Sequence, residues 1–316
     1  MVFAHLFGQK QQAPDLLPAV DHAIASVEPL LKQINGYPDD YLAPVSSALA
    51  YAHALATSLP GPLTVNRESY ASDPLVHALF PSLESVTEAL SSSLPLQTLL
   101  RQIPSDGELY ALMGMRRQEK TVVGMQLSGQ LVQHDVVQNM VYFTSHTIDN
   151  PASSELQARE KIAMSFFDRL IAKVAQRIAQ RKLGQQELLQ EKDLLIAQLR
   201  SADEAARPAL EGRLADLLDR LQATVVTLEL ERYPEDFAAI LLDPAQHLRL
   251  EQTPIKLDSM GIRLPDQDIA QGKIIVFDDL IGYDRRNWTV TLVRCSDIPH
   301  EAFASKLERA YRTLTI

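Results

Sequence analysis

Leucine recurs at heptad spacing in the middle of the chain. One set has gaps of four and three residues in alternation and consists of Leu210, Leu214, Leu217, Leu221, Thr224 and Leu228. A preceding set consists of Leu188, Leu195 and Leu199. Heptad spacing keeps one apolar face of a helix turned toward a partner helix. We therefore predict a long antiparallel α-hairpin, similar to a coiled coil, over residues 151–233, with Gly184 as an end or weak point of its first helix.

The first 104 residues also have a helical pattern of apolar positions. Residues 20–34 and 41–59 share the same alternation of four- and three-residue gaps. Pro29 lies inside the first run and is expected to kink or split that helix, because proline has no N–H to donate. Shorter helices are predicted to start near Pro74, Pro81 and Pro95. Short connections between these helices predict a helical bundle over residues 1–104.

The pattern changes to alternation after residue 104. Residues 105–150 are predicted to form a meander of three or four antiparallel strands, with turns at Ser128-Gly129 and Gln138-Asn139. Residues 234–316 are expected to give a short helix, further strands that end in a β-hairpin, and a final helix. Small isolated sheets are poorly stable, so the two β-rich stretches are expected to complete one sheet. The sequence thus predicts an α+β fold in which the α-hairpin is inserted into an antiparallel sheet.

Composition places the chain among ordinary globular proteins. It has 316 residues, 46% of them hydrophobic and 22% charged, and a formal net charge of −10. Its one cysteine, Cys295, excludes an internal disulfide framework and favours a reducing, cytoplasmic location. The N-terminal residues are too polar for a signal peptide, and no apolar run approaches the roughly 18 residues of a membrane span. The acidic net charge disfavours nucleic acid as a partner.

Sequence motifs for known chemistry are missing. The eight histidines form no pair at zinc-ligand spacing on a helix, and neither a phosphate-binding glycine loop nor a nucleophile elbow occurs. We therefore predict no catalytic residue, no metal ligand and no cofactor, and enzymatic activity is not the favoured expectation.

The most concentrated polar cluster follows the next-to-last predicted strand. Its members, all in the predicted loop or at its ends, are Asp278, Asp279, Tyr283, Asp284, Arg285, Arg286 and Trp288. Three neighbouring carboxylates can hold a hard cation, which keeps a metal-dependent hydrolase with carboxylates at 278–284 as an alternative. Adjacent arginines can clamp a phosphate or a carboxylate. The simplest interpretation is a solvated turn whose opposite charges neutralise one another.

Basic residues recur every four positions on the first long helix, at Lys173, Arg177 and Arg181. Such a stripe can contact phosphates, so nucleic-acid binding through residues 159–182 is a second alternative. The stripe can equally pair with acids of the facing arm, which carries Asp216, Asp219 and Glu229. Residues 155–183 have a net charge of +4 and residues 184–232 a net charge of −4, which favours internal neutralisation.

The function that the pattern favours is assembly rather than chemistry. A projecting α-hairpin suits a scaffold or adaptor that binds a protein partner or a second copy of the chain. Leu218 and Val225 lie off the main leucine seam and predict a second contact face. We expect this face, and the charged cluster at 278–288, to be the places where the protein meets its partners.

Overall fold

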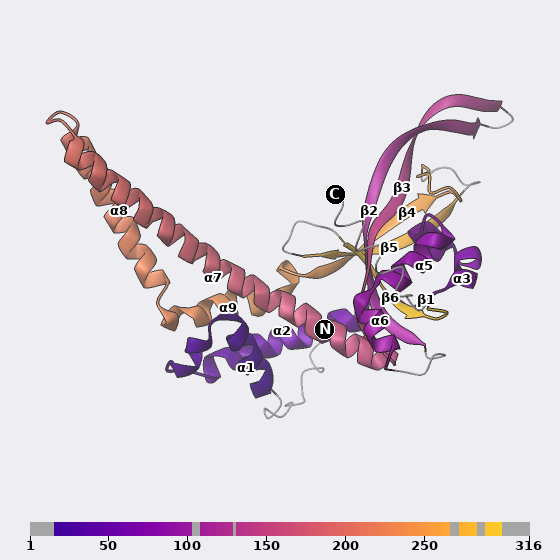
Figure 1. Cartoon of the computed structure of the whole chain (residues 1–316), viewed down its shortest axis with the longest axis horizontal. Coiled ribbons are helices and arrows are strands. Elements are labelled where there is room, and N and C mark those ends of the chain that lie inside the picture. Colours follow the sequence, from indigo (N-terminus) through magenta and orange to yellow (C-terminus); the bar gives the residue numbers. More distant parts are fainter. Residues whose placement is uncertain (1–15, 103–107, 129–130, 266–271, 283–287, 299–316) are drawn as a thin grey trace, which may run out of the picture. The chain divides into compact units, whose positions relative to one another are not determined.

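The computed structural model confirms the α+β class (Figure 1). It describes residues 16–102, 108–128, 131–265, 272–282 and 288–298. The chain forms two compact units, and each unit is built from two separate stretches of sequence. The first unit comprises Met1–Tyr51 and Phe167–His247, and the second comprises Ala52–Phe166 and Leu248–Ile316. Two of the three boundaries between the units fall inside helices α2 and α7, and the third lies between His247 and Leu248.

The first unit is helical. Its elements include α1 (Leu16–Val27), the 3-10 helix η2 (Pro29–Gln33), α2 (Asp39–Ser58), α7 (Glu155–Ser201), α8 (Arg207–Thr227), η3 (Leu230–Arg232), α9 (Tyr233–Leu241) and η4 (Pro244–Gln246). Pro29 divides the first apolar run as predicted, because α1 ends before it and η2 begins at it. The ring of Tyr41 meets that of Phe237 edge to face, with centroids 5.0 Å apart, and both residues are buried. Aromatic contacts of this kind join α2 to α9 in the core.

The predicted α-hairpin is present, and its first arm is longer than expected. Helix α7 runs for 47 residues and passes through Gly184 without a break. Glycine costs a helix interior only about 1 kcal/mol relative to alanine, and the good helix formers on both sides outweigh that. Helix α8 begins at Arg207, so Pro208 lies in its first turn, where its missing N–H has no helical partner to lose.

The hairpin closes through the leucine seam. Leu195 of α7 is buried together with Leu217 and Leu221 of α8. Partly buried leucines extend this cluster at Leu188, Leu210 and Leu214. Figure 1 shows the joined ends of α7 and α8 beyond the other helices of the first unit. The heptad pattern therefore predicted the packing as well as the helices.

The second unit contains a sheet that joins both β-rich stretches. Its described strands are β1 (Leu63–Val65), β2 (Leu109–Ser128), β3 (Leu131–Ala152), β4 (Arg249–Leu257), β5 (Lys273–Ile281) and β6 (Trp288–Cys295). The order is β3-β2-β6-β5-β4, all neighbours being antiparallel, while β1 pairs with β6 in parallel. The β2–β6 pairing makes one sheet of the two stretches, and the helices from α7 to η4 are inserted between β3 and β4.

The strands are fewer and longer than the sequence suggested. Residues 109–128 and 131–152 form two paired strands instead of a meander of three or four, and the predicted turn residue Gly129 lies outside the described residues. Gln138 and Asn139 lie inside β3, paired with Val122 and Thr121. Polar residues are tolerated there because much of this ribbon is exposed to solvent. The final helix predicted near Pro299 lies outside the described residues.

Four short helices cover one face of this sheet: α3 (Arg67–Ser72), α4 (Pro74–Leu79), α5 (Leu83–Ser92) and α6 (Leu94–Leu100). Side chains before them accept their first free N–H groups, as Asp73 does from Leu75 and Ser82 from Ser85. The core below contains Phe80, Phe143, Phe277, Met113 and Cys295. Burial raises the pKa of the Cys295 thiol to about 12, so this cysteine is an inert packing residue.

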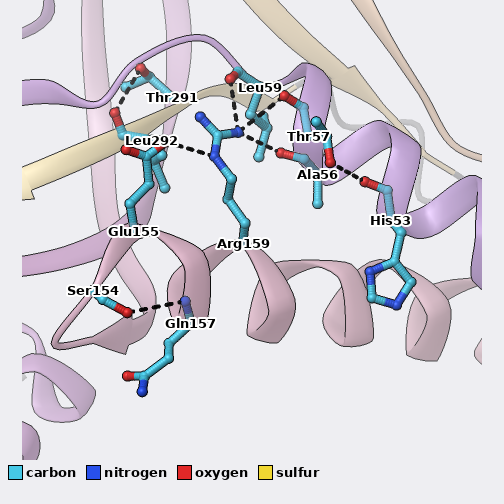
Figure 2. Close-up of polar contacts among 10 residues, drawn as sticks. All are labelled: His53, Ala56, Thr57, Leu59, Ser154, Glu155, Gln157, Arg159, Thr291 and Leu292. Carbon is cyan, nitrogen blue, oxygen red and sulfur yellow. Dashed lines mark hydrogen bonds and ion pairs between the residues drawn. The ribbon is translucent and has the colours of Figure 1, made fainter.

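Arg159 in the first part of α7 holds the end of α2 (Figure 2). Its Nη1 donates to the carbonyl oxygens of Ala56, Thr57 and Leu59 at 2.8, 3.2 and 3.1 Å. Its Nε donates to Glu155 Oε1 at 2.8 Å. The last carbonyls of a helix have no partner within the helix, so one guanidinium here satisfies acceptors that would otherwise need water.

We predict that Arg159→Met lowers the free energy of unfolding by about 2 kcal/mol, because three carbonyl acceptors, two of them in part-buried hydrogen bonds, lose a charged donor. Methionine keeps much of the apolar stem and isolates the loss of the guanidinium. Arg169→Met is the control, since Arg169 is exposed on the same helix and its loss should change stability by less than about 0.5 kcal/mol. Urea denaturation measures both variants, and equal effects would refute the capping role.

Candidate functional site

Two arginines of the basic stripe on α7 contact α9. Arg177 Nε donates to Asp236 Oδ1 at 3.0 Å, and Arg181 Nη2 donates to Asp236 Oδ2. Asp236 lies on α9 and is only 2% exposed. Lys173, half-buried, donates from Nζ to Gln176 Oε1 at 3.5 Å. The arginines are therefore neutralised internally, but by an acid that the sequence interpretation did not name, since it named Asp216, Asp219 and Glu229.

Neighbouring groups complete a charged cluster at the base of the hairpin. Lys182 Nζ lies 3.3 Å from Glu28 Oε2 and 5.9 Å from the ring centre of Tyr233. The Arg181 guanidinium lies at the same distance from that ring. Burial and then the charge of Lys173 lower the pKa of His247. These contacts hold α7, α9 and the residue between α1 and η2 together, so the cluster is occupied by the protein's own groups.

Asp278 and Asp279, the first two aspartates of the predicted loop, lie in β5 instead. Asp279 is 4% exposed, and its carboxylate receives Arg117 Nη2 at 2.8 Å. The hydroxyls of Thr253 and Thr289 donate to the same carboxylate at 2.7 Å each. This network ties β2, β4, β5 and β6 to one another. Aspartate is depleted in strands, which is why an Asp-Asp pair looked like the start of a loop.

Asp278 has a different environment from its neighbour, because successive strand residues face opposite sides of the sheet. It is 9% exposed, and the hydrogen bond that reaches its carboxylate comes from Gln252 Nε2 at 3.3 Å. Burial raises the pKa of Asp278, while the bond from Gln252 opposes this and the charge of Asp279 adds to it. Asp278 is thus a buried acid with a weak neutral partner.

The rest of the predicted cluster is only partly described. Trp288 begins β6, and the guanidinium of Arg116 lies 5.2 Å from the centre of its ring. Tyr283, Asp284, Arg285 and Arg286 lie outside the described residues. Among the residues that the structure does describe, no group of three His, Cys, Asp or Glu side chains is placed to hold a metal ion.

The α7–α8 hairpin exposes leucines beside its closed seam. Leu183 and Leu194 of α7 are 56% and 60% exposed, and Leu218 of α8 is 48% exposed. Leu183 and Leu194 are separated by three helical turns and so share one face of α7. The side chain of Val225 is not among those described. The hairpin thus combines an internal apolar seam with further apolar side chains in contact with water.

A hollow that no sequence signal indicated lies where β5 and β6 separate. These strands pair at Asp279↔Thr289 and Leu280↔Trp288, and β1 then pairs with β6 at residues 293–295. A cavity of about 190 Å³ opens between them, lined by Leu75, Leu79, Met115, Phe277, Asp278 and Thr289 among others. A larger hollow of about 700 Å³ lies along Lys273 and Ile275, against α3 and α4.

No family model, curated protein or solved structure matches this chain. In the described part of the chain, none of the helices is long and apolar enough to span a membrane.

Proposed function

We propose that the chain is a non-enzymatic interaction or assembly protein, a scaffold or adaptor, whose α7–α8 hairpin binds a protein partner. One observation carries the proposal: the hairpin closes its own seam with buried leucines and still exposes leucines on both helices. Leu183 and Leu194 on one face of α7 are spaced as anchors for a partner helix. Leu218 of α8 also lies next to the seam and supports the second contact face.

A cytoplasmic location is part of this proposal. Cys295, the one cysteine of the chain, is free and buried, which suits a reducing compartment. The partner in the proposal is another protein, with self-association of the hairpin as the competing outcome. Binding of another protein and self-association would use the same exposed leucines. The mass of the assembly distinguishes the two outcomes.

The two alternative functions have less support. Nucleic-acid binding needs free cations, yet Arg159, Arg177, Arg181 and Lys182 have acceptors within the protein. A metal-dependent hydrolase needs free carboxylate oxygens, yet those of Asp279 receive an arginine and two threonines. Neither alternative is proposed further.

The test replaces the exposed leucines with lysine in one variant: Leu183→Lys, Leu194→Lys and Leu218→Lys. A desolvated interface anchor commonly contributes about 2 kcal/mol or more, so we expect partner binding to weaken at least about thirtyfold. The matched control places lysine at three exposed glutamines of the same helix, with Gln186→Lys, Gln190→Lys and Gln198→Lys. This control adds the same charge, and its affinity for the partner should differ from that of the unmodified chain by less than about threefold.

Binding is measured by crosslinking from position 190 in the native host, with mass spectrometry of the captured chains, followed by titration of the purified partner. Light scattering against the monomer mass of 35.2 kDa shows whether the captured chain is a second copy. Retention of the same partner at unchanged affinity by the leucine variant would refute the hairpin as the binding surface.

A further inference from the structure

Strand β5 has one edge that the described strands leave open along most of its length. On one side it pairs with β4 along its whole length, from Arg249↔Ile281 to Leu257↔Lys273. On the other side it pairs with β6 only at Asp279 and Leu280. In the part of the chain that the structure describes, no strand pairs with this second side of residues 273–278. Proteins usually cover or block such edges, because unpaired backbone groups are a template for another strand.

The position of Pro254 indicates which backbone groups face the open edge. Pro254 of β4 is paired with Val276 of β5 and has no N–H to donate. An antiparallel pair that contains proline fits best when both residues direct their backbone groups away from each other. Since this direction alternates along a strand, the N–H and C=O groups of Ile274, Val276 and Asp278 face the open edge. By the same alternation, the backbone groups of Leu280 also point away from β4, and Leu280 is indeed paired on that side with Trp288 of β6.

The surroundings of the edge form a recess for an extended chain. Leu75 and Leu79 of α4 and Phe277 of β5 line the smaller cavity beside it. The larger hollow continues along the first half of β5, beside His77 and Lys273. Ile274 and Val276 are 70% and 44% exposed next to this recess. Backbone groups along one side and apolar pockets beside them are the two features by which sheets capture a peptide strand.

Asp278 gives the recess a charge preference. It lines the smaller cavity and is 9% exposed. Among the described residues, it accepts a hydrogen bond from Gln252, which is neutral, and lies next to Asp279, whose charge is already matched by Arg117. Lys273 lines the other hollow. A buried carboxylate in this situation is stabilised by a cation that comes from outside.

We propose that the open edge of β5 binds an extended segment of a partner protein as an added strand, and that Asp278 receives a lysine or arginine side chain of that segment. The site lies in the second unit, whereas the hairpin leucines lie in the first, so this inference goes beyond the proposed function and does not depend on it.

The test uses three acetylated and amidated fluorescent peptides. The first is Thr-Val-Lys-Val-Thr-Val, the second has norleucine in place of lysine, and the third has the lysine sequence with alternate backbone nitrogens methylated. We expect the full-length protein to bind the lysine peptide about tenfold more tightly than the norleucine peptide, as a charge-assisted hydrogen bond provides. N-methylation should abolish binding, because it removes the donors that pair with β5. Hydrogen exchange should show protection at the amide of Val276.

The protein variant Asp278→Asn separates the charge from the shape of the site. It should bind the lysine and norleucine peptides equally, while the hairpin leucine variant should bind them as the unmodified chain does. Three results overturn the proposal: binding by none of the peptides, undiminished binding of the N-methylated peptide, or an undiminished lysine preference in Asp278→Asn.

Discussion

Asp279→Ala is expected to reduce the free energy of unfolding by about 4 kcal/mol, the range found when one partner of a buried ion pair is removed. The Asp279 side chain is 5% exposed and that of Arg117 is 21% exposed, so little water can replace the lost carboxylate. The hydroxyls of Thr253 and Thr289 lose their acceptor as well. Because these groups come from β2, β4, β5 and β6, the loss should loosen the centre of the sheet. Urea denaturation of the whole chain, followed by far-ultraviolet circular dichroism, measures it.

Asp278→Asn is the matched control for Asp279, and its effect should have the opposite sign. Burial raises the pKa of Asp278, so the folded protein holds this proton more tightly than the unfolded chain does. Stability therefore falls as the pH rises from the unfolded-state pKa through the folded-state pKa, and the loss is complete above the latter. Asparagine removes this loss, so the variant should be more stable than the unmodified protein at pH 7 and equally stable below the unfolded-state pKa. A destabilised Asp278→Asn at pH 7 would contradict the assigned environments.

The helical part of the fold was readable from the sequence because its signals are local. Gaps of four and three residues identify one face of a helix, and the leucines from Leu188 to Leu221 form the seam that they predicted. Prolines placed the starts of α4 and α6 for a similar reason, since a first helical turn needs no N–H. Gly184 was misjudged because its cost is small compared with that of ending a long amphipathic helix.

The sheet was harder to predict because its partners are far apart in sequence. Whether the chain turns or stays extended at Gln138 and Asn139 depends on the neighbouring strand β2. The local sequence pattern contains no information about that strand. The separation of β5 from β6, and with it the recess at Asp278, depends on β1 taking part of the edge of β6. Only a three-dimensional arrangement shows this.

Asp236 was missed although the sequence contains a signal for it. The residue falls within the apolar stripe of α9, beside Tyr233, Phe237 and Ile240, all of which are buried. A carboxylate on a buried stripe needs a cation, and Arg177 and Arg181, one helical turn apart, are spaced to supply two. The acids expected to face the basic stripe lie on the hairpin arm, whereas Asp236 lies on α9.

Asp236→Ala should therefore destabilise the first unit by about 3 kcal/mol, since it leaves two guanidinium groups without their shared carboxylate. Arg181 has a 29% exposed side chain and Arg177 a 53% exposed one, against 3% for that of Asp236. Exposed partners are screened by water, so a double-mutant cycle should give a larger coupling energy for Asp236 with Arg181 than with Arg177. The control is Glu235→Ala, an exposed acid adjacent in sequence, which should change stability by less than about 0.5 kcal/mol.

The consequence for the hairpin follows from where this ion pair lies. Arg177 and Arg181 precede the hairpin arms on α7, and Asp236 follows them on α9, so the pair fixes both chains at the base. Hydrogen exchange of Asp236→Ala should speed up in α9 and the last turns of α8 while Leu195 and Leu217 stay protected by their own seam. Equal loss of protection along the whole hairpin would instead mean that the seam depends on its base and does not close by itself.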